Sequence, residues 1–321
     1  MKHKYLFVTV LLIVLLLAGM GLTGLYVAVE SEPEEELQIV TSFYPVYIAV
    51  SNVVGDTEGV SVTNLSEPKT GCMHDYQLTP EDMKILSRAD IFVVNGGGIE
   101  SFLADVAEQY PELVIIDACQ NVELLGEAED DSNPGEDEHD YAGEDAEHDH
   151  AGANAHVWMS IERYMAQITN IEDALAQRDA GREAVYRENA ENYRKRLVEL
   201  RDGAAGLSDN AQNAPVVLLH EAYAYVAEDY GMQVIDTLNL DEERQVSAGE
   251  VAELIAQIRE NGVAVVLAEE LYGKDMGEII QEETDAKVYY LDTLNRGTYQ
   301  RDSYLTGMEE NIRILKEAFA E

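Results

Sequence analysis

Cysteine, tryptophan and basic residues are scarce in this chain. It has two cysteines, one tryptophan and 21 Lys and Arg residues against 63 Asp and Glu residues, which gives a net charge of −42 over 321 residues. Nucleic-acid binding needs clustered Lys and Arg to neutralise phosphates, so this composition argues against nucleic acid as a partner. The acidic excess is compatible with cations as ligands and equally with a solvated face that repels its neighbours, and for most of the charge the second interpretation is favoured.

Several catalytic signatures are also missing. His220 in "HEAYAY" lacks the second histidine of H-E-x-x-H, and no G-x-S-x-G nucleophile elbow occurs. The "NGGGIE" stretch follows a predicted strand but lacks the G-x-G-x-x-G spacing and the lysine of a phosphate-binding loop. Glu221 could serve a hydrolase as general base, although a place at a helix start is the simpler role for it. We therefore predict that the protein is not an enzyme.

An uncharged run occupies the N-terminal region from Tyr5 to Val29, after Lys2 and Lys4 and before an acidic stretch. A bilayer span needs about 20 apolar residues, whereas the apolar part of a secretory signal has about 7–15. No cysteine lies in or just after the run, so it offers no lipid-modification site, and Tyr26 disfavours cleavage. We predict that residues 1–36 form a membrane anchor or signal segment with an acidic linker. The rest of the chain is then extracytoplasmic, either anchored at the cell surface or secreted.

Short apolar runs alternate with helical stretches from Leu37 onward. The predicted strands lie at 37–44, 60–67, 89–97, 112–119, 214–221, 232–238, 263–270 and 286–294. Between the second and third runs, Thr79 is a plausible N-cap, followed by Pro80 at the first helical position and Asp82 in the first turn. This alternation predicts βαβ units and parallel sheets, with a ligand crevice at the carboxyl ends of the strands.

The middle of the chain is predicted to be helical, with one break around residues 179–181. Its second part, residues 182–207, contains no proline and could form a helix of about 35 Å at 1.5 Å per residue. We predict an α/β fold of two lobes, each a parallel sheet flanked by helices, joined by one long helix. The expected boundaries are 37–180 for the first lobe, 181–206 for the linking helix and 207–321 for the second lobe.

The segment 127–150 interrupts this order within the first lobe. It contains twelve carboxylates, three histidines (His139, His148 and His150) and few apolar residues. Such a composition cannot bury enough apolar surface to pack, so we expect a disordered loop.

Three other histidines lie at predicted strand ends or helix starts. His74 follows a predicted strand and precedes a helix, His156 stands in "NAHVWMS" beside Trp158, and His220 ends a strand. Asp292 also ends a strand, in the second lobe. Each residue alone is more often a cap or a satisfied polar group, but three imidazoles and a carboxylate at strand ends facing one crevice make a tetrahedral set that suits zinc.

The residues match a known family. The stretches "HDYQLTPEDMKILSRADIFVVNGGGIE", "AHVWMS", "LLHEAYAYVAEDYGM" and "VYYLDTL", with an acidic His-containing loop between the first two, occur in the order and at the separations of the zinc-binding, ZnuA-type solute-binding proteins of metal ABC importers. The resemblance runs from about Gln38 to the C-terminus. It implies the cluster A-I fold, in which two lobes joined by a long rigid helix hold one metal ion between them.

The resemblance also implies the ligands and the partners. By position, His74, His156, His220 and Asp292 resemble the metal ligands, and Zn²⁺ is the expected transported ligand. Family members that bind manganese or iron typically carry a carboxylate at the position of His220, and more imidazole favours zinc. The resemblance implies delivery of zinc to an ABC permease and its ATPase, and we expect a monomer. A manganese- or iron-binding homologue and a metal-binding surface adhesin of the same fold remain alternatives.

The loop histidines and the cysteines complete the predicted sites. In proteins of this family such loops are thought to gather or sense zinc, so His139, His148 and His150 are candidates for auxiliary metal capture, with a plain acidic spacer as the alternative. Cys72 and Cys119 form an even pair in an exported chain, which predicts one disulfide. Neither cysteine belongs to a C-x-x-C pair, so metal ligation by them is the weaker alternative.

Overall fold

Two four-stranded sheets organise the computed structural model, which describes residues 37–66, 76–126, 153–240 and 246–320. The first sheet has the order β2-β1-β3-β4, and β3 pairs in parallel with both β1 and β4. Its central strand β3 is buried at all four positions, as expected for the middle of a sheet covered on both faces. The strands of this sheet are β1 (Leu37–Thr41), β2 (Val60–Asn64), β3 (Ile91–Val94) and β4 (Val114–Asp117).

The second sheet repeats this arrangement with the order β6-β5-β7-β8, and all three strand pairs are parallel. The prediction of an α/β fold with two parallel sheets is therefore confirmed. The strands of this sheet are β5 (Pro215–Leu218), β6 (Gln233–Thr237), β7 (Val265–Ala268) and β8 (Lys287–Tyr290).

Side chains cap the N-termini of two helices in this part of the chain, α3 and α5. The predicted start of α3 is confirmed: Thr79 is its N-cap, Pro80 its first residue, and Thr79 and Asp82 form a reciprocal capping box. The helices of this part are α2 (Tyr44–Val54), α3 (Pro80–Leu86), α4 (Leu103–Gln109), the short 3-10 helix η2 (Val157–Met159) and α5 (Ile161–Arg178).

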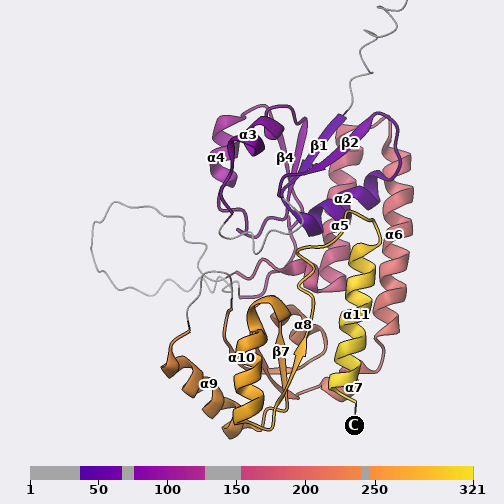
Figure 1. Cartoon of the computed structure of the whole chain (residues 1–321). Helices are drawn as coiled ribbons and strands as arrows, with labels where there is room; N and C mark the ends of the chain where they lie inside the picture. The colour runs from indigo at the N-terminus through magenta and orange to yellow at the C-terminus, as the bar shows by residue number, and fades with distance from the viewer. Residues whose placement is uncertain (1–36, 67–75, 127–152, 241–245, 321) are drawn as a thin grey trace, which may run out of the picture. The chain divides into compact units, whose positions relative to one another are not determined.

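A long helix, α6 (Glu183–Gly203), occupies most of the segment expected to link the two lobes, and the predicted break precedes it. Its buried positions, Tyr186, Ala190, Tyr193 and Leu197, recur every three or four residues and so line one face. This face packs on α5, and α6 also contacts α11 (Ser303–Ala318) (Figure 1). Tyr164 of α5 stacks on Tyr304 of α11 with ring centroids 3.9 Å apart, which ties the C-terminal helix to the middle of the chain.

The second sheet is covered by helices whose apolar faces form one core. Buried leucine, isoleucine and valine side chains of β5, β7, α9 and α10 belong to a single cluster that includes Leu254, Val266 and Ile280. The helices of this part, besides α11, are α7 (Leu207–Ala211), α8 (Tyr223–Asp229), α9 (Ala248–Asn261) and α10 (Glu270–Glu283).

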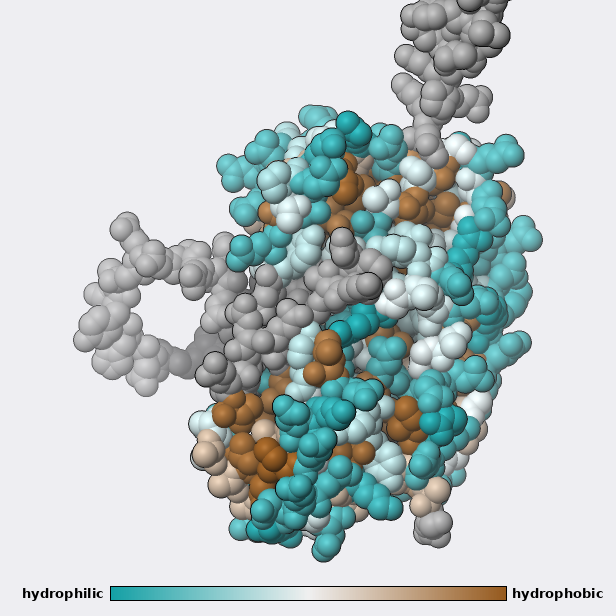
Figure 2. Space-filling view, viewed as in Figure 1, coloured by the Kyte–Doolittle hydropathy of each residue, from teal (hydrophilic) through white to brown (hydrophobic). Residues whose placement is uncertain are grey.

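Residues Gln38–Glu321 form one compact unit, so the predicted lobe boundaries at residues 180 and 207 stay predictions. Figure 2 shows a hydrophilic surface along α6, where ion pairs such as Lys195–Glu191 and Arg187–Glu183 lie. No helix in the described part of the chain has the length and apolar character needed to cross a bilayer. The predicted anchor or signal segment, residues 1–36, lies outside the described residues.

Candidate metal centre

The structure brings two of the four predicted ligands together. His156 is the residue before η2, and His220 lies two residues beyond the end of β5. Their imidazole rings are perpendicular, with centroids 5.2 Å apart, and the two residues are only 1% and 6% exposed. Two buried imidazoles at this separation provide nitrogen donors of the kind that zinc prefers.

Asn154 holds His156 from one side. Its side-chain oxygen Oδ1 lies 2.9 Å from Nδ1 of His156 and also accepts a hydrogen bond of 3.0 Å from the His156 backbone N–H. Its amide nitrogen donates to the backbone carbonyl of Glu221, 2.8 Å away. The Glu221 carboxylate is a more distant neighbour of the ring, with Oε1 3.8 Å from Nδ1 of His156.

His220 is held at the N-terminus of α8. The backbone N–H of Ala222, the N-cap of this helix, donates to Nδ1 of His220 over 3.1 Å. The ring also packs edge-on against Tyr223, with centroids 6.1 Å apart. His220 is thus oriented through the helix that begins immediately after it.

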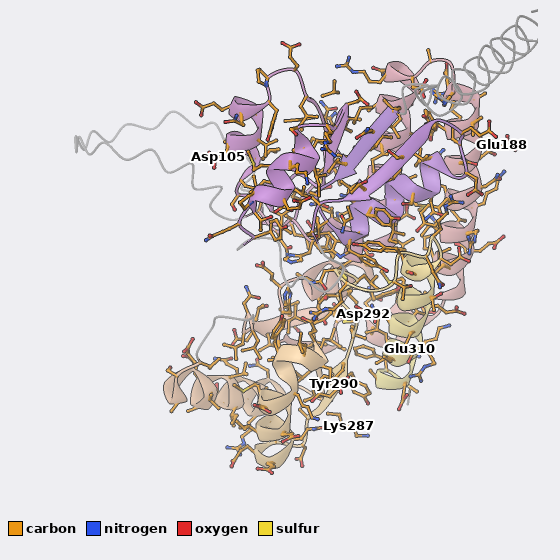
Figure 3. All side chains as sticks on the ribbon, turned by 45° about the horizontal axis from the view of Figure 1, so that its top comes forward. Asp105, Glu188, Lys287, Tyr290, Asp292 and Glu310 are labelled. Atoms are coloured by element: carbon orange, nitrogen blue, oxygen red, sulfur yellow. The ribbon has the colours of Figure 1, made fainter. Side chains whose placement is uncertain are left out.

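Asp292 lies two residues beyond the end of β8, the position that His220 has after β5. Figure 3 shows Asp292 near Tyr290 and Lys287 at the other end of the strand. Asn311 of α11 fixes the backbone of Asp292 by accepting from its N–H at 2.8 Å and donating to its carbonyl at 2.7 Å. Desolvation by the surrounding protein raises the pKa of the Asp292 carboxyl, although its surface is exposed in a groove, and a hydrogen bond from the Leu294 N–H opposes this rise.

Hydrogen bonds connect the segment of Asp292 to the segments of both histidines. The indole N–H of Trp158, two residues after His156, donates to the backbone carbonyl of Thr293 over 2.8 Å. The hydroxyl of Tyr223, three residues after His220, donates to the carbonyl of Leu291 over 2.7 Å. The residues on both sides of Asp292 are therefore attached to the elements that carry His156 and His220. Trp158 and Tyr223 are buried, as packing residues should be, but they also position this loop.

The remaining predicted ligands lie outside the described residues. These are His74 and the loop histidines His139, His148 and His150. Within the described ranges, no group of three or more His, Cys, Asp or Glu side chains is arranged to hold a metal ion. The set of four ligands, which needs His74, stays a prediction.

The predicted disulfide also stays a prediction. Cys119 carries a free, buried thiol, and Cys72 lies outside the described residues. The Cys119 sulfur accepts a hydrogen bond of 3.3 Å from the Gln167 amide, and burial raises the pKa of the thiol. Thiol counting on denatured, unreduced protein would decide whether the pair forms.

The "NGGGIE" stretch encloses the side-chain carboxyl group of its own glutamate, Glu100. The backbone N–H groups of Asn95 and Gly96 donate to the carboxylate of Glu100 over 2.7 and 3.1 Å. Gly96 has a positive φ of 83°, and a Cβ atom there would lie 1.9 Å from Asp117, so this turn requires glycine. The structure thus explains why the stretch resembles a phosphate loop without being one.

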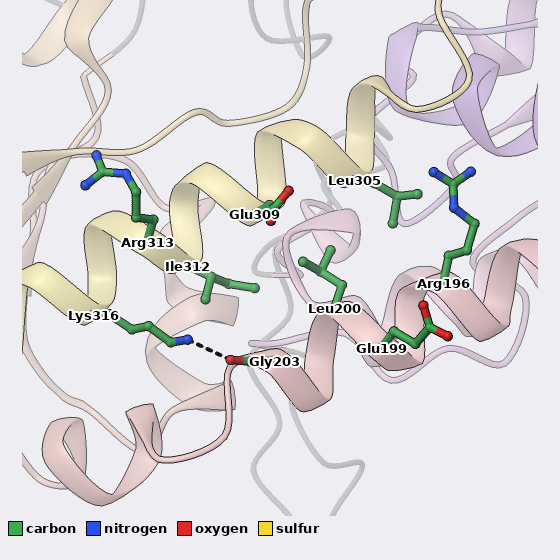
Figure 4. A pocket seen from close by; sticks show the side chains of 9 residues that line it. All are labelled: Arg196, Glu199, Leu200, Gly203, Leu305, Glu309, Ile312, Arg313 and Lys316. Carbon is green, nitrogen blue, oxygen red and sulfur yellow. Dashed lines mark hydrogen bonds between the residues drawn. The ribbon is translucent and has the colours of Figure 1, made fainter.

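Two grooves differ in their relation to the candidate ligands. The larger of two grooves that Asp292 lines has a volume of about 710 Å³ and also contains Glu269, Tyr272 and Arg296. A second groove of about 530 Å³ lies between α6 and α11, where Lys316 donates to the Gly203 carbonyl over 2.7 Å (Figure 4). None of the predicted ligands lines this second groove, so we do not assign it to metal binding.

Asn154 is the site residue that sequence reasoning missed. A signal was present, because an asparagine two residues before a functional residue often accepts hydrogen bonds from the backbone that follows it. The contact with Glu221, however, joins residues 67 positions apart, and no local pattern indicates it.

Comparison with known proteins agrees with this fold. The chain is 26% identical over 290 residues to the high-affinity zinc uptake system protein ZnuA of Bacillus subtilis, covering 88% of each chain. It is 24% identical to the manganese-binding lipoprotein MntA of Halalkalibacterium halodurans, covering 97% of each. It is 27% identical to the zinc-binding protein AdcA of Streptococcus pyogenes but spans only 56% of that protein's length.

Solved structures show the same fold with different metals. The solute-binding protein FpvC of Pseudomonas aeruginosa in complex with Ni²⁺ has a TM-score of 0.73 and 26% identity, covering 89% of this chain and 99% of FpvC. FpvC has also been solved with Mn²⁺. The Zn(II)-bound AdcA of Streptococcus pneumoniae has a TM-score of 0.71 and 26% identity, covering 89% of this chain and 58% of AdcA.

The family model "Zinc-uptake complex component A periplasmic" (ZnuA) matches residues 39–318. Proteins of this family are solute-binding proteins and not enzymes, and they bind metal ions and work with an ABC permease and its ATPase. With a match over nearly all of the residues that form the two sheets, this chain belongs to the ZnuA family.

Proposed function

We propose that this protein captures a zinc ion outside the cytoplasm through His74, His156, His220 and Asp292 and delivers it to the permease of an ABC importer. The observation that carries the proposal is the pair of buried rings of His156 and His220, 5.2 Å apart. The two residues are 64 positions apart in the sequence, so only the fold brings their nitrogen donors together, as a shared metal ion requires.

The donor set favours zinc over harder cations. Two imidazoles already meet in the structure, His74 would add a third, and Asp292 would add a carboxylate, which together make a tetrahedral set typical of zinc. Manganese prefers more oxygen ligands, and a second carboxylate would be expected in place of His220. The proteins of similar sequence include a manganese-binding one, and FpvC holds nickel or manganese, so the metal has to be tested directly. A manganese- or iron-binding role and an adhesin role stay alternative predictions.

A competition titration of metal-free protein with Zn²⁺, Mn²⁺ and Ni²⁺ tests the proposal. We expect one tight site that prefers Zn²⁺, and we expect His156→Ala and His220→Ala each to weaken zinc binding by more than about 100-fold, because a ligand is lost. His139→Ala is the matched control and should leave this site unchanged. Unaltered zinc affinity in His220→Ala would refute the ligand assignment, and tighter binding of Mn²⁺ than of Zn²⁺ would refute the choice of metal.

Deleting residues 127–150 tests the division between site and loop. The loop carboxylates and imidazoles are expected to bind metal only weakly and in a salt-sensitive way, because no fixed geometry holds them. The deletion should therefore leave the tight site intact and slow zinc capture only at low supply. Loss of the tight site on deletion would mean that a loop histidine is a ligand.

A further inference from the structure

We propose that Asn154 is a positioning residue that keeps the proton of His156 on Nδ1 and thereby presents Nε2 of His156 to the metal. The inference rests on the proposed function, since it assigns a task to a neighbour of a proposed ligand. It concerns a residue that the sequence did not single out, and it makes a statement about the metal-free protein that can be measured without any metal.

The orientation of the Asn154 amide group follows from two backbone groups. The His156 backbone N–H can only donate, and it lies 3.0 Å from Oδ1 of Asn154. The Glu221 backbone carbonyl can only accept, and it lies 2.8 Å from Nδ2 of Asn154. A flipped amide would place an N–H₂ group against an N–H and an oxygen against a carbonyl, so both contacts would become repulsive. Oδ1 must therefore face His156.

The proton position on His156 follows from this orientation. Nδ1 of His156 is 2.9 Å from the same Oδ1 atom, which carries no hydrogen, so Nδ1 must be the donor. A neutral imidazole has only one N–H, and its lone pair is then on Nε2. A histidine that binds a metal through one nitrogen characteristically donates its other N–H to an oxygen acceptor, which fixes both the tautomer and the ring orientation. Asn154 supplies that acceptor.

His220 provides a contrast inside the same protein. Its Nδ1 accepts from the Ala222 backbone N–H, so the neutral ring carries its proton on Nε2. The two facing rings therefore have opposite tautomers in this structure. If zinc binds Nε2 of both, the proton of His220 has to move, whereas the proton of His156 is already in the required place.

Asn154 is itself held by elements from distant parts of the sequence. Its N–H donates to the Leu125 carbonyl over 2.7 Å, in an antiparallel bridge, and its carbonyl accepts from the Tyr225 hydroxyl of α8. Glu221, the acceptor of its amide, directly follows His220. These contacts leave the amide group little freedom to turn away from His156, and they link the orientation of His156 to the segment of His220.

The experiment is a long-range ¹H–¹⁵N correlation spectrum of metal-free, ¹⁵N-labelled protein, which distinguishes the two histidine tautomers, combined with a zinc competition titration. We expect His156 to carry its proton on Nδ1 in the unsubstituted protein. Asn154→Ala should shift His156 toward the Nε2–H tautomer and weaken zinc binding by about 10- to 100-fold. Asn154→Asp keeps an oxygen acceptor for Nδ1 and should retain the tautomer, but its second oxygen then faces the Glu221 carbonyl, so part of the zinc affinity should be lost.

Asn239→Ala is the matched control. The Asn239 amide donates to the Glu221 carboxylate over 3.2 Å, so it contacts the same neighbour as Asn154. No hydrogen bond from Asn239 to His156 is found among the described residues, and this variant should change neither the tautomer of His156 nor the zinc affinity.

Three results would overturn the inference. One is an Nε2–H tautomer of His156 in the unsubstituted protein, which needs no variant. The second is a loss of zinc affinity in Asn154→Ala with an unchanged tautomer of His156, which would make the role of Asn154 purely structural. The third is a shifted tautomer of His156 in Asn154→Ala with unchanged zinc affinity. Failure of the proposed function is a separate result, since it would appear as unaltered zinc affinity in His156→Ala whatever the tautomer.

Discussion

The strands β3 and β7 occupy the same position in their two sheets, and a buried glutamate follows each of them. The protein stabilises these two carboxyl groups in different ways. Glu100 follows β3, is 4% exposed and accepts hydrogen bonds from the Ser42 hydroxyl and from the Asn95 and Gly96 backbone N–H groups. Glu269 directly follows β7, is 7% exposed and is paired with Arg296 and with the Thr293 hydroxyl.

Neutral hydrogen-bond donors stabilise the carboxylate of Glu100, whereas the positive charge of Arg296 stabilises that of Glu269. Burial raises the pKa of Glu100 to about 7 in spite of its three donors. Burial also raises the pKa of Glu269, while Arg296 opposes the rise. Oε2 of Glu269 has no hydrogen-bond partner among the described residues, so its charge depends more heavily on the guanidinium group.

The comparison also shows that strand ends at the same position in the two sheets can serve different purposes. In the first sheet, the loop after β3 closes on its own carboxylate, Glu100, and is satisfied internally. In the second sheet, His220 follows β5 and Asp292 follows β8, the two strands on either side of β7, and both residues belong to the proposed ligand set. Topology indicates where ligands can be placed, but the residue types decide how each strand end is used.

The largest effect on stability is expected from removing the counter-charge of Glu269. Arg296→Met leaves a buried carboxylate unpaired and should lower the free energy of unfolding at pH 8 by about 3 kcal/mol, measured by urea denaturation. Adding Glu269→Gln should recover much of this loss, because the uncompensated charge is then absent. Arg313→Met, which breaks only exposed pairs with Glu310 and Glu317, is the control and should have little effect. Equal effects of Arg296→Met and Arg313→Met would contradict the distinction.

A second effect, specific to the first sheet, depends on pH. The folded pKa of Glu100, about 7, lies above its ordinary value of 4.5, so between these values the folded state keeps a proton that the unfolded state has released. The contribution of Glu100 to stability therefore falls as the pH rises from about 4.5 to 7 and is constant above that range. Relative to Glu100→Gln, the unsubstituted protein should lose about 2 to 3 kcal/mol of unfolding free energy across this window.

Urea unfolding at a series of pH values from 5 to 8 measures this dependence. Glu108→Gln, at an exposed position of α4, is the control and should follow the unsubstituted protein in parallel. A stability difference between the unsubstituted protein and Glu100→Gln that stays constant with pH would show that Glu100 titrates normally.

The smallest effect should come from removing one donor to Glu100. Ser42→Ala deletes the hydroxyl that lies 2.7 Å from Oε1 and should cost about 1 to 2 kcal/mol at pH 8, where the carboxylate is charged. Because this hydrogen bond lowers the pKa of Glu100, the variant should also shift the pH window upward. A loss of stability that is the same at pH 5 and pH 8 would mean that the hydroxyl acts by packing alone.

Much of the fold could be predicted from the sequence, because the signals are local. Buried strands such as β3 appear as short apolar runs, and the cap of α3 depends on Thr79, Pro80 and Asp82, which are neighbours along the chain. The family motifs likewise indicated His156, His220 and Asp292 as candidates. The exact strand ends were less well predicted, since the apolar run at 37–44 includes both β1 and the beginning of α2.

The sequence by itself determined the alternation of strands and helices, the acidic surface and the residue types available as ligands, because these depend on composition and on contacts within a few positions. Only the tertiary structure decided that the rings of His156 and His220 face each other, that Asn154 is held against His156 by the Glu221 carbonyl, and that the glycine turn after β3 encloses Glu100. These contacts join side chains and backbone groups whose distance depends on how the sheets and helices pack. Packing is a property of the whole chain, and no local pattern contains it.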